Sequence, residues 1–367
     1  MKLLIVTQKV DRDDENLGAF YSWFEEFGRL AGEAVIIAGN IGNHALPDNV
    51  RLYGFGAGTR LGRIWKFWEI FSREYAECDA VFFHQIPEFV IAAAPFLLAR
   101  PRPSALWYAH KSVTWKLKLA ERLVRTVFTS SEAGFRLPSK KVMWVGQAVD
   151  TDFFSPAASD KRRAAPDALH LITIGRISPI KNYEAIIDAM ILLENDWAHP
   201  WTLDVIGGPL MPRDTEYMAV LKRRVEETGL EDHIRFLGPR RFSEIPAMLQ
   251  EHDVFINMSQ TGSLDKAVLE AMSCGLSVIT TNEAYRDILP PQYFLVRSDP
   301  GLLAERIRTL ASEQRPNMAL RTAVISYHGL ERTIKSMMDI LTRTHLKNRF
   351  RSEMLDFLAK TVKREEE

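Results

Sequence analysis

The sequence predicts an α/β protein made of two doubly wound domains in series. Short apolar runs alternate with longer amphipathic segments, which is the rhythm of repeated strand–helix units. The apolar runs lack polar alternation, as expected when helices cover both faces of a parallel sheet. The rhythm stops at residues 155–168 and then restarts. We therefore expect two Rossmann-like domains, with binding residues just after the strands.

The first domain is predicted at 1–155. Its expected strands are 3–7, 34–38, 80–84, 106–108, 126–129 and 142–145, and its helices are 19–30, 89–98 and 114–123. The segment 155–168, SPAASDKRRAAPDA, has two prolines, five alanines and a charge cluster, a composition typical of an exposed connector. The domain boundary is placed there.

The second domain is predicted at 156–326. Its expected strands are 169–174, 203–206, 234–237, 254–257 and 276–280, and its helices are 182–193, 216–228, 244–250 and 267–273. A last helix is expected over 327–344, with Leu330, Ile334 and Met338 at steps of four, followed by a charged tail. We expect the segment 327–367 to pack back toward the first domain.

Composition excludes several classes of protein. The chain has 367 residues, 46% of them hydrophobic, so it can bury sizeable cores. Its 47 basic and 47 acidic residues cancel, which argues against nucleic-acid binding through bulk positive charge. Cys78 and Cys274 are the only cysteines, too few for a disulfide framework. No apolar stretch is long enough to span a bilayer, so we expect a cytoplasmic protein, with peripheral contact at the inner face of the membrane left open.

The first chemical motif is the segment 175–182, GRISPIKN, between a predicted strand and a predicted helix. Gly175 lets the backbone leave the strand in a tight turn, and Arg176 and Lys181 bring two cations to a helix N-terminus. This arrangement suits a diphosphate, although an ordinary solvated loop would occupy the same position.

The second motif is the segment 261–275, TGSLDKAVLEAMSCG, a polar loop that enters a short helix. The Glu270 carboxylate can accept two hydroxyl groups of a ribose, and the amides of Gly262, Ser263 and Leu264 can face phosphate or sugar oxygens. Taken alone, Glu270 would more simply be an ordinary residue on the surface of a helix.

Together the two motifs resemble the nucleotide-sugar-binding half of the GT-B retaining glycosyltransferases of family 4. Their fold consists of two Rossmann-like domains facing each other across a cleft. Four further segments are similar to that family: 145–154 (VGQAVDTDFF), 203–209 (LDVIGGP), 234–238 (IRFLG) and 252–259 (HDVFINMS). The resemblance implies a retaining hexosyltransferase of polysaccharide or glycolipid synthesis that moves a sugar from a UDP- or GDP-sugar to a glycan or lipid-linked acceptor. It implies no metal and no cofactor, since the nucleotide sugar is a substrate.

The resemblance also implies roles for individual residues. Arg176 and Lys181 would bind the donor diphosphate, and Glu270 would hold the ribose. His110, at the end of a strand, matches a histidine near the reacting carbon of the sugar. The remaining donor-binding positions that it implies are Gly18, Gly175, Gly208, Gly238, Gly262, Ser263, Leu264 and Asp265.

The sequence departs from the family pattern at one important place. The pattern has a glutamate eight residues before Glu270, where this chain has Gly262. Asp265 and Lys266 also stand where the family has a glycine and an apolar residue. Because the missing glutamate contacts the donor sugar in the family, its replacement affects sugar identity more than nucleotide binding. We hypothesise, from proximity, that Asp265 supplies the replacement carboxylate.

Other patterns carry less weight. The DxD triplets at 11–13 and 150–152 are expected about once by chance, and the segment 54–58, GFGAG, lacks the third glycine of a dinucleotide fingerprint. In the segment 60–71, RLGRIWKFWEIF, cations and aromatics are mixed as in an interfacial helix. Leu61, Trp65 and Trp68 are also spaced as the buried face of a helix, which we favour. His84 ends a strand and either faces the cleft or is structural.

The sequence supplies no clear carboxylate nucleophile for a covalent glycosyl intermediate. We therefore favour front-face transfer, in which the departing diphosphate helps to take the proton of the acceptor. Arg176, Lys181 and loop amides would stabilise the leaving group, and domain closure would exclude water. Two alternatives remain: a nucleotide-sugar-binding GT-B protein without transfer activity, favoured by Gly262, and a nucleotide-sugar epimerase.

Overall fold

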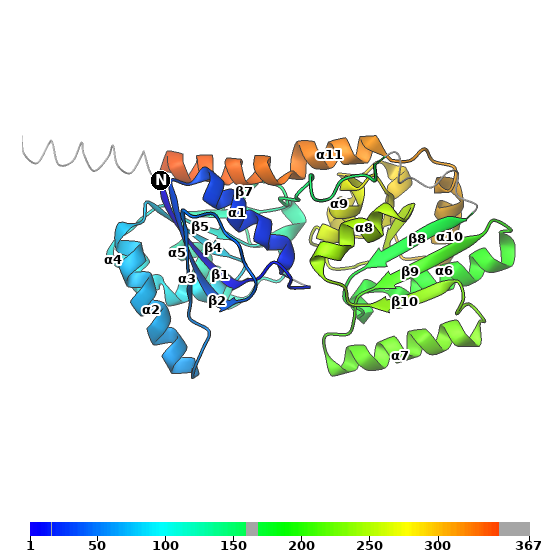
Figure 1. Cartoon of the computed structure of the whole chain (residues 1–367), viewed down its shortest axis with the longest axis horizontal. Coiled ribbons are helices and arrows are strands. Elements are labelled where there is room, and N and C mark those ends of the chain that lie inside the picture. The colour runs from blue at the N-terminus through cyan, green and yellow to red at the C-terminus, as the bar shows by residue number, and fades with distance from the viewer. Residues whose placement is uncertain (16, 159–167, 345–367) are drawn as a thin grey trace, which may run out of the picture.

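The computed structural model describes residues 1–15, 17–158 and 168–344, which form two α/β domains (Figure 1). Much of the predicted connector, at 159–167, and the charged tail, at 345–367, lie outside the described residues. Both sheets are parallel throughout, and the first has the strand order β3-β2-β1-β4-β5-β6-β7 while the second has β10-β9-β8-β11-β12. The prediction of two Rossmann-like domains is confirmed.

The first domain contains a seven-stranded sheet covered on both faces. Its strands are β1 (Lys2–Val10), β2 (Glu33–Ile41), β3 (Val50–Gly54), β4 (Ala80–His84), β5 (Ser104–Trp107), β6 (Thr126–Thr129) and β7 (Val142–Trp144). Its helices are α1 (Tyr21–Leu30), α2 (Arg60–Glu77), α3 (Pro87–Ala92), α4 (Ala94–Ala99) and α5 (Trp115–Leu123). The helix predicted over 89–98 is therefore two short helices, because Pro95 cannot donate the hydrogen bond that would continue α3.

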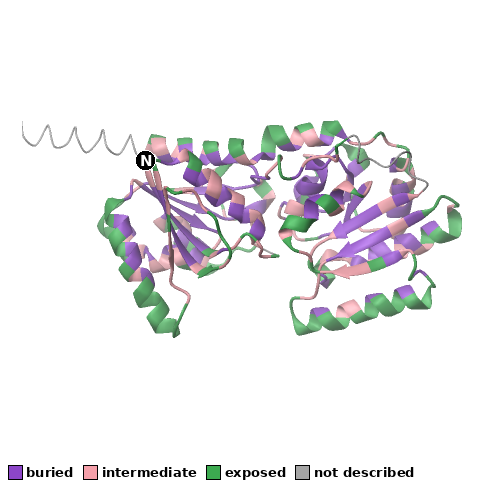
Figure 2. Ribbon diagram, viewed as in Figure 1, coloured by how far each residue is buried: buried purple, intermediate pink, exposed green. Residues whose placement is uncertain are grey.

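The second domain contains a five-stranded sheet. Its strands are β8 (Leu169–Ile174), β9 (Trp201–Ile206), β10 (Ile234–Gly238), β11 (Val254–Asn257) and β12 (Ser277–Thr280). Its helices are α6 (Tyr183–Asp196), α7 (Pro212–Glu227), α8 (Ile245–Gln250), α9 (Lys266–Ser273), α10 (Pro300–Leu310) and α11 (Met318–His328). Both sheets are buried along most of their length in Figure 2.

The packing of β1 explains why the strands are apolar throughout. Leu3 and Ile5 belong to the core on one face of the first sheet, whereas Leu4 and Val6 belong to the core on the other face. Successive side chains of a strand point to opposite faces, so a strand between two layers of helices needs apolar residues at every position.

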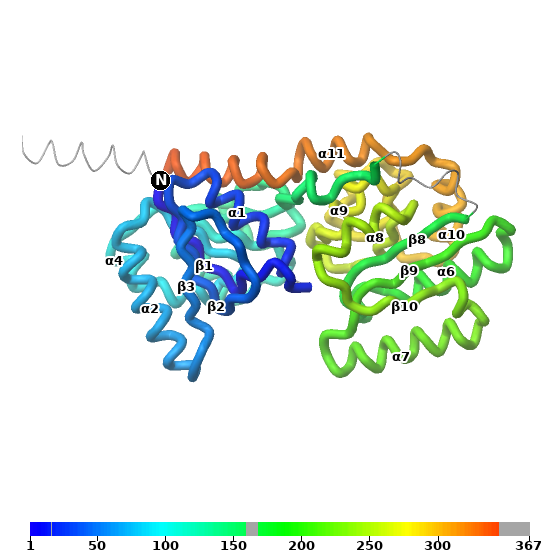
Figure 3. The backbone as a smooth tube through the Cα atoms, in the orientation of Figure 1, coloured from blue at the N-terminus to red at the C-terminus, as the bar shows by residue number. Residues whose placement is uncertain are grey.

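The chain returns to the first domain after α11. Residues 330–344 are helical and add Ile334, Met337, Met338 and Leu341 to the core that contains Trp23. Figure 3 shows this segment, in orange to red, running along the first domain beside α1. The single helix predicted over 327–344 is interrupted at Gly329, which forms a bridge with Val149.

The first two turns of α2 differ from the prediction. The core-facing side chains of this helix are Phe67, Ile70, Phe71, Glu74 and Tyr75. Leu61 and Trp65 are 72% and 69% exposed, so the prediction that they form the buried face is wrong. The helix begins before it reaches the packed part of the domain, and its first two turns therefore face outward (Figure 2).

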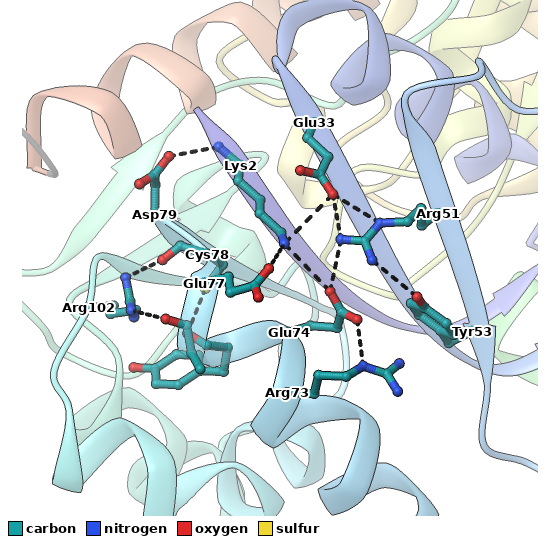
Figure 4. A network of polar contacts seen from close by, with 12 residues as sticks. Lys2, Glu33, Arg51, Tyr53, Arg73, Glu74, Glu77, Cys78, Asp79 and Arg102 are labelled. Carbon is teal, nitrogen blue, oxygen red and sulfur yellow. Dashed lines mark hydrogen bonds and ion pairs between the residues drawn. The ribbon is translucent and has the colours of Figure 1, made fainter.

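A network of charges lies at the amino ends of β1 and β2, away from the carboxyl ends where binding residues are expected (Figure 4). Glu74 is only 2% exposed and accepts hydrogen bonds from Arg51 (3.0 Å) and Arg73 (2.9 Å). The Lys2 ammonium lies 3.7 Å from the same carboxylate. Because the buried charge is paired by several cations, this network is structural.

Candidate functional site

The two domains meet through the loops that follow the carboxyl ends of their strands. In each bridging pair, one partner belongs to the first domain and the other to the second. The pairs are Lys111 Nζ with the Gln260 carbonyl (2.9 Å), Gln147 Nε2 with the Leu264 carbonyl (3.4 Å), Lys266 Nζ with the Ala19 carbonyl (3.0 Å), and Arg136 with Glu283. The segments predicted to hold a donor therefore lie at this domain interface.

The loop after β8 carries the first predicted pair of cations. Its backbone is held by the next turn, because Gly175 N donates to the Ile206 carbonyl at 3.0 Å. Lys181 ends a short 3₁₀ turn, and Asn182 then adopts a left-handed conformation, with φ of 52°, before α6. Arg176 is exposed, and its Nε lies 3.4 Å from Ser178 Oγ. Within the described chain no carboxylate forms an ion pair with Arg176.

The glycine turns after β9 and β10 lie beside this loop. Ile177 N donates to the Gly208 carbonyl, and Gly207 N donates to the Gly238 carbonyl, both at 3.0 Å. Gly238 has φ of 72°, and a Cβ at this position would meet no atom within 4 Å. The predicted positions Gly175, Gly208 and Gly238 therefore occupy adjacent turns at one edge of the second sheet.

Lys181 and Asp265 form an ion pair between the two motifs. The two loops are joined by a hydrogen bond from Gln260 N to the Ile180 carbonyl (3.0 Å), and Lys181 Nζ lies 2.9 Å from Asp265 Oδ1. Asp265 also accepts hydrogen bonds from Asn257 Nδ2 (3.1 Å) and Thr261 Oγ1 (3.3 Å). Burial raises the pKa of Asp265, but Lys181 and the hydrogen bonds outweigh burial and hold it below its usual value.

Lys266 extends from α9 into the first domain. Its Nζ lies 4.3 Å from the centroid of the Phe20 ring and 5.3 Å from that of Trp23, at distances that allow cation–π attraction. Burial lowers the pKa of Lys266 to about 8, although the negative charge of Glu270 partly opposes this shift. Glu270 is 7% exposed. Burial raises the pKa of Glu270 to about 7, although the positive charge of Lys266 partly opposes this shift. The predicted ribose-binding carboxylate therefore faces a cation of its own helix.

The start of the second motif is tightly enclosed. Gly262 has φ of 69°, and a Cβ there would collide with the side chains of Glu283 and Arg136. The Ser263 carbonyl accepts a hydrogen bond from Asn282 Nδ2 at 2.7 Å, and Leu264 is buried. A glutamate at position 262 would therefore need the Arg136–Glu283 pair to move.

Two loops of the first domain reach the same interface. Gly18 opens a 3₁₀ turn, and a Cβ there would lie 3.1 Å from Phe242 Cβ of the second domain. His110 follows β5 and is exposed, and its Nδ1 accepts a hydrogen bond from Ser112 N at 3.1 Å. Although its surface is exposed, the surrounding protein atoms partly remove water from the ring, and this effect and the charge of Lys111 lower the pKa of His110.

His84, at the end of β4, is more deeply placed than His110. It is 3% exposed, its Nδ1 lies 3.1 Å from Thr7 Oγ1, and its ring packs 4.4 Å from that of Phe20. Burial and the positive charge of Lys266 lower its pKa to about 3, so its imidazole is neutral near neutral pH.

Two large surface hollows lie elsewhere. One, of about 700 Å³, is at the amino ends of β8, β11 and β12 and is lined by Leu169, Asp253 and Cys274. Another, of about 830 Å³, lies where the chain crosses between domains and is lined by Asp150 and Arg321. None of the predicted donor residues lines either hollow.

Sequence reasoning did not assign roles to three residues at the interface. Lys266 was visible as a departure from the family pattern, but its contact with Ala19 joins residues 247 positions apart. Arg136 and Glu283 pair across 147 positions and sit in no motif. Local patterns contain no signal for such contacts.

The second domain matches a known family, and the fold of both domains has known counterparts. Residues 168–313 match the family described as Glycosyl transferases group 1. The two domains have the GT-B fold, and the structure of Anabaena HepE in complex with UDP and glucose superposes with a TM-score of 0.72 at 16% identity, covering 93% of this chain and 99% of that one. Sucrose-phosphate synthase from Thermosynechococcus elongatus superposes with a TM-score of 0.74 at 13% identity, covering 94% and 99%.

Curated relatives share part of the sequence. D-inositol 3-phosphate glycosyltransferase of Salinispora tropica is 27% identical over an alignment of 270 residues, and the match covers 66% of this chain and 54% of that protein. A phosphatidylinositol N-acetylglucosaminyltransferase subunit of Arabidopsis thaliana is 26% identical over an alignment of 226 residues, and the match covers 56% of this chain and 48% of that protein. The chain thus spans about half the length of these relatives. Among the described residues, no helix is both long and apolar enough to cross a membrane.

Proposed function

We propose that this protein is a retaining glycosyltransferase of family 4 that transfers a hexose from a UDP- or GDP-sugar to a glycan or lipid-linked acceptor. The observation that carries the proposal is the convergence of three segments at the domain interface. These are the cationic loop after β8, the helix that carries Glu270, and the Gly18 turn. The names of the relatives support sugar transfer, and the UDP and glucose bound to one structural neighbour support a nucleotide-sugar donor.

In this proposal the donor diphosphate lies against Arg176 and Lys181. Arg176 is exposed, carries no carboxylate partner in the described chain, and can form paired hydrogen bonds to phosphate oxygens. Both cations would stabilise charge on the departing diphosphate more strongly in the transition state than in the ground state. Glu270 would accept the ribose hydroxyls, and His110 would lie near the reacting carbon of the sugar.

The state of the nearby carboxylates bears on which retaining route the protein would use. A covalent glycosyl intermediate needs a carboxylate nucleophile at the anomeric carbon. Asp265 is held by Lys181, Asn257 and Thr261, and Glu270 faces Lys266. Since Asp265 is already hydrogen-bonded and paired, and Glu270 is the proposed ribose ligand, we favour front-face transfer, with the acceptor proton passing to the leaving diphosphate.

The test is transfer from a panel of UDP- and GDP-sugars to glycan and lipid-linked acceptors, with the anomeric configuration of donor and product compared by NMR. We expect a retained product with one donor. Arg176→Ala should lower turnover by roughly a hundredfold or more, as expected for loss of a transition-state cation, and leave the fold intact. An inverted product would contradict the retaining mechanism.

One observation favours a second candidate, a nucleotide-sugar-binding protein without transfer activity. Lys181 and Glu270 already face opposite charges supplied by Asp265 and Lys266. Binding of a nucleotide sugar by calorimetry, without its consumption by any acceptor in the panel, would support this candidate instead.

A further inference from the structure

The first two turns of α2 form an exposed surface unlike the rest of that helix. All residues from 60 to 66, which we call the α2 tip, are exposed. They include Leu61 at 72%, Ile64 at 40% and Trp65 at 69% exposure. Figure 2 shows this end of the helix in green, projecting from the first domain. Large apolar side chains gathered on a projecting element mark a binding surface, whereas single exposed ones are ordinary.

The apolar residues of the tip lie on their own stripe. At about 100° per residue, Leu61, Ile64, Trp65 and the following Trp68 centre about 100° away from the core-facing stripe of α2. Trp68 is half-buried against the core, but core packing does not account for Leu61, Ile64 and Trp65. Trp68 Nε1 donates to the Ala92 carbonyl at 2.8 Å, and the rings of Trp65 and Trp68 lie edge to face at 5.9 Å. The stripe is thus fixed to the body of the domain.

The tip also carries unbalanced positive charge. Arg60, Arg63 and Lys66 are exposed, and none of them forms an ion pair with a carboxylate in the described chain. The first acidic residue along the helix is Glu69. The chain as a whole has no net charge, so this is a local concentration. Cations beside exposed tryptophan and leucine complement the anionic headgroups and apolar interior of a lipid surface.

We propose that the α2 tip docks the protein onto an anionic lipid bilayer. Its apolar side chains enter the headgroup region, and its three cations lie on lipid phosphates, which long flexible side chains can reach. This proposal goes beyond the proposed glycosyl transfer and does not rest on it. Docking would also place a lipid-linked acceptor on the same surface as the protein.

The first test is flotation of the full chain with vesicles of phosphatidylcholine alone or mixed with phosphatidylglycerol. We expect flotation with the mixed vesicles, weakening as salt is raised. Leu61→Ser with Trp65→Ser should abolish it. Arg63→Gln with Lys66→Gln should weaken partitioning roughly 25-fold, about fivefold for each cation. Leu98→Ser, an exposed position on α4 of the same domain, is the matched control and should float like the wild type.

A second measurement reads the tip directly. Cys78 and Cys274 are both buried, so an Ile64→Cys variant can be labelled at the tip with a fluorophore that responds to polarity. We expect a blue shift with the mixed vesicles, and none for a label on Leu98→Cys. The proposal is overturned if the wild type stays soluble with both vesicle types, or if the tip variants float like the wild type. It is equally overturned if Trp65→Ser instead abolishes a dimer formed without lipid, since a second copy would then be the occupant.

Discussion

The ion pair between Lys181 and Asp265 predicts opposite effects on folding and on ligand binding. Its charged atoms are 2.9 Å apart, and the two side chains are 17% and 14% exposed. Asp265→Asn keeps the size of the side chain and removes the charge. Removing one partner of a buried pair costs about 3 kcal/mol, which corresponds to a fall in Tm of about 6–12 °C. Because the pKa of Asp265 is lowered by folding, the wild-type pair contributes stability at neutral pH and loses it as pH falls through that pKa.

Asp265→Asn should lower stability, as above, but it should raise the affinity for nucleotides. A diphosphate oxygen bound to Lys181 at the same 2.9 Å would lie at most about 6 Å from the Asp265 carboxylate. Two unit negative charges at that separation repel by about 3 kcal/mol at an effective dielectric constant of 20. This is roughly a hundredfold in Kd, and solvent screening reduces it. We therefore expect Asp265→Asn to bind UDP or GDP roughly ten- to a hundredfold more tightly than the wild type.

Isothermal titration calorimetry, below the Tm of the variant, measures this directly. Uridine and guanosine serve as controls, because they lack phosphate and should bind both proteins equally. Lys181→Ala should weaken UDP and GDP binding in both the wild type and the Asp265→Asn variant, because Lys181 is the proposed ligand of the diphosphate. If Asp265→Asn bound UDP and GDP no more tightly than the wild type, Lys181 would not be the diphosphate ligand.

Three further predictions follow from groups outside that pair. Glu74→Gln, which leaves its cationic neighbours without a counter-charge, should lower the free energy of unfolding in urea by about 3 kcal/mol and leave nucleotide affinity unchanged. The pKa of His84 is about 3 in the folded protein, so the unfolded state gains a proton as pH falls below about 6.5, and stability falls by up to about 1.4 kcal/mol per pH unit. His84→Gln should make the fall in thermal stability between about pH 6.5 and pH 4 less steep, and an unchanged slope would contradict this assignment. A double-mutant cycle of Arg136→Ala and Glu283→Ala should give a coupling energy of only about 0.5 kcal/mol that vanishes at high salt, because both side chains are largely exposed.

Most of the fold could be predicted because its strands are buried on both faces. Strand β1 needs apolar residues at every position, which is visible in any sequence window. Strand β3 (Val50–Gly54) was not predicted, because it lies at the edge of the sheet, is mostly half-buried and contains an exposed arginine. The spacing of Leu61 and Trp65 suggested a buried face, since periodicity reports amphipathicity but not which neighbour covers the apolar side.

The candidate site could be predicted only in part, because local sequence patterns do not show which distant segments meet. Turns after strands are local features, so the positions of Arg176, Lys181 and Glu270 could be inferred from motif order. The partners of these residues could not. Asp265 was hypothesised as a ligand of the donor sugar, yet in the structure its oxygens are already engaged by Lys181 and by two polar side chains. Whether a charged side chain is available depends on contacts between segments far apart in the sequence.

The two departures from the family pattern act together. Asp265 places a negative charge on a predicted phosphate ligand, and Lys266 places a positive charge beside the predicted ribose ligand. Lys266 also donates to the Ala19 carbonyl of the first domain, so its ammonium forms part of the contact between the domains. A ligand bound at Glu270, as proposed, would therefore lie close to a cation that also joins the two domains. If Glu270 binds the nucleotide as proposed, Lys266→Met, which keeps the length and removes the charge, should change both nucleotide affinity and the contact between the domains.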